Sequence, residues 1–323
     1  MKKIYITRKI PDVGIAMLRE KEYEIDINPD DRVLTKDELL NALRQKPYDG
    51  VISLLTDAIN AEVFDAVPTA KIFSNYAVGF NNIDCAEAAK REIVVANTPG
   101  ASTSAVAEFT VTLTLALMHQ IVDADQFIRD GKYQGWNPSI FMGSELPGKT
   151  LGLLGAGRIG AEAARMLMTA FGMKIAYYDV QRNEKFEEAT GATFYASVDE
   201  VLAVADVVSV HVPLLPTTHH LLGAEQFKKM KKTALLVNTS RGPVLDEVAL
   251  VEALKAGTFA GAALDVFEFE PKISEGLTSL PNVILTPHIA SATDVARDTM
   301  ATMAADNIIS FFEGKEVKNK IKV

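Results

Sequence analysis

Short apolar runs alternate with longer, more polar stretches along nearly the whole chain. In the N-terminal part the apolar runs predict strands at residues 3–6, 23–27, 51–55, 71–74 and 93–96. Runs without polar alternation are typical of a parallel sheet that helices cover on both faces. The stretches between them predict helices, one of which begins at a capping box formed by Thr35 and Glu38.

A second series of strands and helices begins near residue 150. Its predicted strands are residues 150–154, 174–178, 207–210, 235–238, 261–264 and 283–285. Ser197 with Glu200, and Asp246, predict the starts of two intervening helices. The last helix, at residues 293–312, is expected to return to the first series. We therefore predict an α/β protein with two doubly wound parallel-sheet domains.

The region between the two series predicts one long helix over residues 101–130, ended by Gly131. A loop rich in glycine, proline and tryptophan follows. The apolar stretch at residues 106–118 contains Glu108 and several threonines. It is too short and too polar to span a bilayer.

Composition narrows the possible partners and location. The chain has 323 residues, 48% of them hydrophobic, and a net charge of −9. These values are typical of a globular protein and argue against nucleic acid or an anionic membrane as the main partner. Cys85 is the single cysteine, so an intrachain disulfide is excluded. With no recognisable signal peptide at the N-terminus, a cytoplasmic protein is expected.

A glycine-rich turn follows the first strand of the second series. Gly155, Gly157 and Gly160 form the pattern G-x-G-x-x-G between that strand and a helix. In this context the glycines allow a tight turn, close approach of a pyrophosphate and close packing of helix on strand. The pattern alone is weak, but its position between a strand and a helix predicts a dinucleotide site.

Asp179 ends the next predicted strand. A carboxylate there can accept hydrogen bonds from the ribose hydroxyls of NAD and would repel the phosphate of NADP. Arg182 stands nearby and is a feature that could accommodate NADP, although such a residue is more often a solvated loop charge. We therefore predict NAD, used as NADH, as the cofactor.

Three polar residues follow later strands and suit the reduction of a 2-oxo acid. Arg241 can bind a carboxylate through two hydrogen bonds, His288 can donate a proton to a carbonyl oxygen, and Glu270 can stabilise the charged imidazole. Each alone would be read as an ordinary surface or structural residue. Together, after strands that share one sheet edge, they predict a catalytic group. No His, Asp and Glu cluster has the spacing of metal ligands, so no metal site is expected.

The chain resembles the D-isomer-specific 2-hydroxyacid dehydrogenase family over nearly its whole length. The motifs that carry this resemblance are residues 78–84, 97–100, 155–160, 211–214, 238–242, 265–271 and 287–288. Residues 76–80 and 135–136 are most similar to those of glyoxylate and hydroxypyruvate reductases. The resemblance implies reversible hydride transfer between NADH and a small 2-oxo acid, giving the D-2-hydroxy acid.

The resemblance also implies roles for individual residues. Arg241, Glu270 and His288 would be catalytic, and the substrate would contact Arg241, His288, Leu55 and the backbone N–H groups of Val78 and Gly79. The residues that would contact the cofactor are Thr103, Gly155, Gly157, Arg158, Ile159, Gly160, Asp179, Val212, Pro213, Thr239 and Asp265.

The domain organisation implied by the resemblance is a Rossmann-type cofactor domain inserted into a flavodoxin-like substrate domain. The substrate domain would comprise residues 1–99 and 288–323, and the NAD-binding domain residues 100–287, with a hinged cleft between them. A homodimer through residues 101–148 is expected. Trp136 would then reach a neighbouring subunit's site, or else it is a core residue.

Several alternatives stay open. A phosphoglycerate dehydrogenase would need extra cations, and residues 53–57 offer none. Sequence pattern separates a D-lactate dehydrogenase poorly, whereas a formate dehydrogenase would be expected to carry an amide in place of Glu270. From another class, an NAD-sensing interaction protein is conceivable. The complete set of Arg241, Glu270 and His288 favours an enzyme.

Overall fold

The computed structural model describes residues 1–322 and shows two compact units. Unit 1 contains residues 1–102 and the chain from Ala292 onward, and unit 2 contains residues 103–291. The predicted boundaries stood at residues 99 and 288 instead. By the observed division, His288 belongs to the same unit as the glycine-rich turn.

Unit 1 is built on a five-stranded parallel sheet with the order β2-β1-β3-β4-β5. Its strands are β1 (Lys3–Ile6), β2 (Glu24–Ile27), β3 (Gly50–Leu54), β4 (Ile72–Tyr76) and β5 (Val94–Ala96). This order is that of flavodoxin-like sheets, in which each strand is followed by a helix that crosses one face. The predicted fold of this unit is confirmed.

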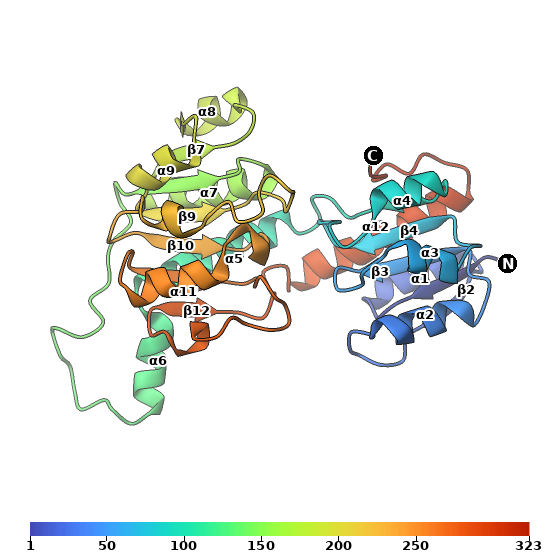
Figure 1. Cartoon of the computed structure of the whole chain (residues 1–323), viewed down its shortest axis with the longest axis horizontal. Coiled ribbons are helices and arrows are strands. Elements are labelled where there is room, and N and C mark those ends of the chain that lie inside the picture. Colours follow the sequence, from blue (N-terminus) through green and yellow to red (C-terminus); the bar gives the residue numbers. More distant parts are fainter. Residues whose placement is uncertain (323) are drawn as a thin grey trace. The chain divides into compact units, whose positions relative to one another are not determined.

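Helices cover both faces of the sheet in unit 1 (Figure 1). They are α1 (Asp12–Glu20), α2 (Lys36–Arg44), α3 (Ala61–Ala66), α4 (Cys85–Lys90) and α12 (Asp294–Phe312). α12 packs against α1 so closely that a Cβ atom on Gly14 would lie 2.5 Å from the carbonyl oxygen of Ala301. Met300 and Ile308 of α12 are buried in one core with Ile4 of β1. The C-terminal helix therefore belongs to the N-terminal unit.

Unit 2 contains a seven-stranded parallel sheet with the order β12-β11-β10-β9-β6-β7-β8. Its strands are β6 (Thr150–Leu154), β7 (Lys174–Tyr178), β8 (Thr193–Phe194), β9 (Val207–Val210), β10 (Leu235–Asn238), β11 (Gly261–Leu264) and β12 (Val283–Leu285). The strand order reverses beside β6, as in Rossmann folds. The predicted fold of this unit is confirmed as well.

Two helical layers enclose the sheet of unit 2 (Figure 1). The helices are α5 (Thr103–Met118), α6 (Ile121–Arg129), α7 (Arg158–Phe171), α8 (Glu184–Thr190), α9 (Val198–Val204), α10 (Ala224–Phe227) and α11 (Glu247–Lys255), with 3₁₀ turns η1 (Gly242–Val244) and η2 (Leu277–Ser279). Val201 of α9 and Leu250 of α11 are buried in one apolar core. Leu113 of α5 and Leu167 of α7 are buried in another.

The prediction of one long helix over residues 101–130 is wrong. α5 ends at Met118 and α6 begins at Ile121, and the two are bent by 61°. Gln120 between them adopts a left-handed conformation with φ of 52°, which ends the helical hydrogen-bond series. In the described residues no single helix is long and apolar enough to cross a membrane; only this bent pair passes a test of length and composition.

The predicted capping residues are confirmed. Thr35 with Glu38 and Ser197 with Glu200 form complete capping boxes at the starts of α2 and α9. The side chain of Asp246 accepts a hydrogen bond from the backbone N–H of Ala249 at the start of α11. These caps satisfy N–H groups that the first turn of a helix leaves unpaired.

Candidate active site

The loops that carry the predicted cofactor and catalytic residues of unit 2 leave the sheet at one edge. All pairings in this sheet are parallel, so the carboxyl ends of the strands lie together. Backbone hydrogen bonds join successive ends: Gly155 N donates to Tyr178 O, His211 N to Leu154 O, and Asp265 N to Asn238 O. Ligands of open α/β sheets bind at such an edge where the strand order reverses.

The glycine-rich turn joins β6 to α7. Gly155 has a φ of 96°, and a Cβ atom there would lie 2.9 Å from the backbone of His211. A Cβ atom on Gly160 would lie 2.2 Å from Gly155 O, so the helix starts in direct contact with the turn. At Gly157 a Cβ atom would meet nothing within 4 Å. The turn thus leaves open space in front of the N-terminus of α7, where a pyrophosphate fits.

Asp179 and Arg182 follow β7 beside this turn. Asp179 Oδ2 accepts a hydrogen bond of 2.8 Å from Ala156 N, which fixes the carboxylate next to the glycines. Arg182 is engaged with Glu187 through its Nε and Nη2 atoms. The hydrogen bond from Arg182 holds the pKa of Glu187 down at about 2, so this pair is charged at neutral pH. Arg182 is therefore held by another carboxylate.

Glu270 and His288 form the hydrogen-bonded pair at this edge. His288 Nδ1 lies 3.0 Å from Glu270 Oε2, while Glu270 Oε1 accepts a hydrogen bond from Phe267 N. Burial alone would raise the pKa of Glu270, but its hydrogen bond with His288, the charges of His288 and Arg241 and the Phe267 N–H outweigh burial and lower it. The carboxylate is thus ionised, and the opposite ring nitrogen of His288 points away from it.

Arg241 lies three residues after the last residue of β10, and it is partly buried. Nη1 donates a hydrogen bond of 2.7 Å to the carbonyl oxygen of Ser240. Burial lowers the pKa of Arg241 and the charge of Glu270 opposes this effect. Arg241, Glu270 and His288 are therefore within electrostatic reach of one another, as catalysis on a carboxylate substrate would require.

Asp265 holds the loop that contains His288. Its carboxylate is fully buried and accepts hydrogen bonds from Thr286 Oγ1 at 2.6 Å, Ile289 N at 2.9 Å and Ala290 N at 2.8 Å. His288 N donates to Asp265 O, and His288 has a left-handed φ of 55°. Sequence reasoning expected Asp265 only at the cofactor, and this supporting role was missed because it depends on the tertiary position of residues 286–290.

The remaining predicted cofactor residues lie around the same edge of unit 2. Thr103 begins α5, Arg158 and Ile159 begin α7, and Val212 and Pro213 follow β9. Thr239 follows β10, and its hydroxyl lies 2.9 Å from that of Thr110 in α5. The contacts of these residues with a cofactor stay predictions.

The predicted substrate residues Leu55, Val78 and Gly79 lie in unit 1, in loops after β3 and β4. Asn97 Nδ2 donates to Val78 O at 2.7 Å, and Asn75 Nδ2 donates to Gly79 O at 2.9 Å. The bond from Asn97 fixes the peptide plane that contains the Gly79 N–H, and the bond from Asn75 fixes the plane that contains the Phe80 N–H. Sequence reasoning missed both; polar residues within or directly after apolar strands are the feature that could have indicated them.

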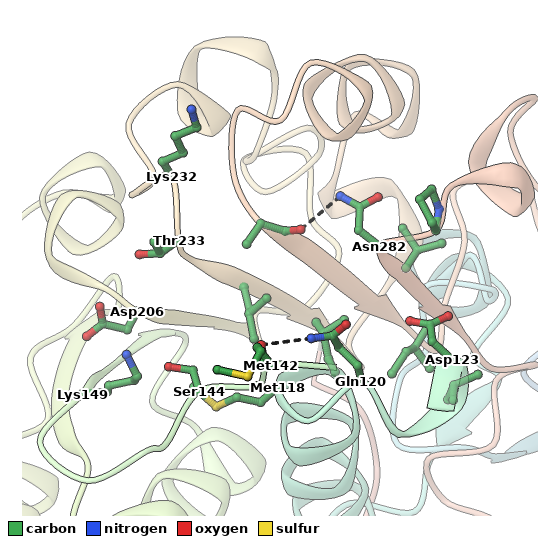
Figure 2. A pocket seen from close by; sticks show the side chains of 18 residues that line it. Met118, Gln120, Asp123, Met142, Ser144, Lys149, Asp206, Lys232, Thr233 and Asn282 are labelled. Carbon is green, nitrogen blue, oxygen red and sulfur yellow. Dashed lines mark hydrogen bonds between the residues drawn. The ribbon is translucent and has the colours of Figure 1, made fainter. Parts of the chain in front are cut away.

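A hollow of ≈ 660 Å³ lies at the opposite edge of the sheet in unit 2. Figure 2 shows Lys149, Asp206 and Thr233 around it, and these residues precede β6, β9 and β10. Gln120 crosses part of it to donate a hydrogen bond to Met142 O. The hollow is thus separate from the catalytic edge and is partly formed by the segment after α5.

Comparison with known protein families shows to which family the chain belongs. Residues 111–290 match the sequence model described as "D-isomer specific 2-hydroxyacid dehydrogenase, NAD binding domain". The chain belongs to the D-isomer specific 2-hydroxyacid dehydrogenases. The family resemblance inferred from the sequence motifs is therefore confirmed, and the protein is an NAD(P)-dependent oxidoreductase.

Individual members of this dehydrogenase family match almost from end to end. A glyoxylate reductase of Thermofilum pendens is 49% identical over 97% of this chain and 92% of its own length. One from Korarchaeum cryptofilum is 45% identical over 99% of this chain and 95% of its own. The crystal structure of an NADPH-dependent glyoxylate/hydroxypyruvate reductase from Sinorhizobium meliloti is 33% identical, with a TM-score of 0.85, and the match covers 99% of this chain and 96% of that one.

Proposed function

We propose that this dehydrogenase reduces a small 2-oxo acid, glyoxylate or hydroxypyruvate, with NADH, giving the D-2-hydroxy acid where the product is chiral. The hydrogen-bonded pair of His288 and Glu270 at the edge that carries the glycine-rich turn is the observation that carries this proposal. The relatives called glyoxylate reductases support the choice of substrate.

The residues around the turn suit NADH. When bound, the dinucleotide supplies the hydride that reduces the carbonyl carbon. The N-terminus of α7 would hold the pyrophosphate and Asp179 the ribose hydroxyls. Arg182 donates its hydrogen bonds to Glu187, and to bind a ribose phosphate it would have to leave this partner. The relative from Sinorhizobium meliloti is described as NADPH-dependent, so membership of the family does not by itself fix which dinucleotide is used.

The three charged residues divide the remaining work. Arg241 would bind the substrate carboxylate and polarise the carbonyl group. His288 would donate a proton from Nε2 to the carbonyl oxygen, because Nδ1 is engaged by Glu270. Glu270, held by the Phe267 N–H, would stabilise the protonated imidazole. In the reverse reaction His288 would accept the proton.

We also propose a homodimer formed through residues 101–148. α6 has no buried residue, and Figure 1 shows α6 and the following loop extending from the rest of unit 2. Ile121 and Ile128 on α6 are each 56% exposed, and Trp136 in the loop is 84% exposed. Apolar side chains gathered on one projecting segment are typical of a surface that a partner covers.

Initial rates of NADH oxidation, followed by absorbance, test the proposal directly. The substrates are glyoxylate, hydroxypyruvate, pyruvate and phosphohydroxypyruvate, each also measured with NADPH. We expect kcat/KM for glyoxylate or hydroxypyruvate to exceed that for pyruvate by about tenfold or more, since one methyl or hydroxyl group changes the fit of a small pocket by that order.

Each other outcome points elsewhere. A preference for phosphohydroxypyruvate or pyruvate would identify a phosphoglycerate or lactate dehydrogenase and overturn the substrate. Faster turnover with NADPH would overturn the assignment of Asp179. Binding of NADH without turnover of any acid would favour the sensor alternative.

A further inference from the structure

A compact group of potential metal ligands lies in unit 2 and includes none of the three catalytic residues. His219, His220 and Glu268 offer one ligand atom each, and these atoms all lie within 4.8 Å of one another. The two imidazole centroids are 4.0 Å apart, and His220 Nε2 lies 2.6 Å from Glu268 Oε1. Two imidazole nitrogens with a carboxylate oxygen are a ligand set that binds zinc and related divalent ions.

Glu268 is positioned for this role by Glu247, the first residue of α11. Glu268 Oε2 accepts a hydrogen bond of 3.0 Å from Glu247 N, and Glu268 N donates to Glu247 Oε1 at 3.2 Å. The side chain of Glu268 is only 9% exposed, so these contacts fix it. One carboxylate oxygen is thereby anchored and the other faces the imidazole of His220. Supporting contacts of this kind orient the ligands of metal sites.

The backbone that carries the two histidines is also fixed. His220 N donates to Pro243 O at 2.9 Å, and Leu222 N donates to Val244 O at 3.1 Å. His220 has a φ of 52°, a left-handed conformation that is uncommon for a residue other than glycine. Both imidazoles are exposed, so an ion held here would keep positions open for water.

We propose that His219, His220 and Glu268 bind one divalent transition-metal ion, with Zn²⁺ as the matching example. Ligand atoms of a tetrahedral zinc ion lie roughly 3.3 Å apart, so the exposed imidazoles need only a small rotation to close on it. The ion would join residues 218–222 to the loop that carries Glu270. Sequence spacing does not indicate this site, because Glu268 is far from the histidines along the chain.

The competing explanation is an ion pair between His220 and Glu268 that needs no metal. The distance of 2.6 Å suits a charge-assisted hydrogen bond. His219 separates the two explanations, because it contributes a ligand but takes no part in that hydrogen bond. Removing its imidazole leaves the ion pair intact and should still weaken metal binding.

Calorimetric titration of the metal-free, tag-free full-length protein with ZnCl₂ tests the proposal. The variants are His219→Ala, His220→Ala and Glu268→Gln, and His119→Ala, an exposed histidine elsewhere in unit 2, is the matched control. We expect one ion per chain and a Kd raised at least about tenfold in each of the three variants. The control should bind as the unaltered protein does, and excess Mg²⁺ should not displace the zinc, because it prefers all-oxygen ligands.

Thermal unfolding gives a second readout. Zinc at about 100 times its Kd should raise the Tm by about 5 °C. At the same zinc concentration His219→Ala should lose about half of this rise or more, while keeping its metal-free Tm. The proposal is overturned if zinc fails to bind with one-to-one stoichiometry. It is equally overturned if His219→Ala, with an unchanged metal-free Tm, binds zinc as tightly as the unaltered protein.

Discussion

At the scale of single residues, the candidate site depends on side chains that hold other groups in place. The carboxylate of Asp265 accepts three hydrogen bonds from the loop around His288, and none of these comes from a catalytic side chain. A buried carboxylate is tolerated only with such partners. Asp265 is therefore a positioning residue, and the placement of His288 depends on it.

Replacing Asp265 with Asn should show this dependence. The amide nitrogen of Asn cannot accept a hydrogen bond, so it would face a backbone or hydroxyl donor. At least one buried group would then lose its partner, which should lower the free energy of unfolding by about 2–3 kcal/mol. Displacement of the His288 loop should lower kcat by about 10–100-fold. Chemical denaturation and steady-state kinetics measure the two effects.

Asp206→Asn is the matched control for this substitution. Asp206 also accepts a backbone hydrogen bond, from Thr150 N, but it lies at the opposite edge of the sheet. It should affect stability without lowering kcat. A native kcat in Asp265→Asn would show that the loop around His288 does not need the carboxylate.

The chemistry of Arg241, Glu270 and His288 could be predicted from sequence because each follows an apolar strand, and parallel strands bring their carboxyl ends to one edge. An interaction of Glu270 with the imidazole of His288 was expected as well, but the atoms that meet were not, because they depend on how the loops after β11 and β12 fold back. The cluster of His219, His220 and Glu268 escaped for the same reason. Residues that meet only through loops leave no periodic pattern.

At the scale of elements, the turn between β6 and α7 combines two kinds of glycine. Gly160 is required by packing, because a Cβ atom there would overlap Gly155 O at 2.2 Å. A Cβ atom placed on Gly157 would have no protein atom within 4 Å. Packing within the protein therefore does not require a glycine at position 157, whereas the close approach of a pyrophosphate would.

Gly157→Ala should therefore separate stability from cofactor binding. We expect a loss of about 1 kcal/mol or less in the free energy of unfolding, since Ala is only a poorer N-cap than Gly. The Kd for NADH, measured by fluorescence titration, should rise about tenfold or more. Gly160→Ala is the comparison and should destabilise the protein much more. Unchanged NADH affinity in Gly157→Ala would refute the assigned pyrophosphate site.

Elements with strong apolar runs or caps were predicted well, and the break between α5 and α6 was not. The strands β6, β7, β9, β10, β11 and β12 have the predicted bounds, and each is a mainly apolar run with buried residues. At the break the chain has His119 and Gln120, without the glycine or proline that usually indicates a helix end. β8 has two residues, too few to form a pattern.

At the scale of the whole molecule, the surface of unit 2 bears on how the chain assembles. α6 has no buried residue, whereas each of the other α-helices in residues 1–322 has at least one. The hollow at the amino edge of the sheet is lined partly by Gln120, Val122 and Met142 from the same region. Both features are consistent with a surface that a second copy of the chain covers.

Light scattering after size-exclusion chromatography should give twice the mass of one chain. The double substitution Ile121→Glu and Ile128→Glu should shift the protein to a monomer, because burying two carboxylates without partners costs several kcal/mol. Val33→Glu, at a residue 46% exposed in unit 1, is the control and should leave the dimer intact. A monomeric unaltered protein, or a dimer that survives both charges, would contradict the proposed interface.

The central claim is that His288, held by Glu270, transfers the proton during reduction. The most direct test is single-turnover and steady-state reduction of glyoxylate by His288→Ala, with NADH affinity measured on the same preparation. We predict that kcat falls by about 10²–10⁴-fold while the Kd for NADH changes less than about twofold. Turnover close to that of the unaltered enzyme, in a variant that still binds NADH, would contradict the assignment.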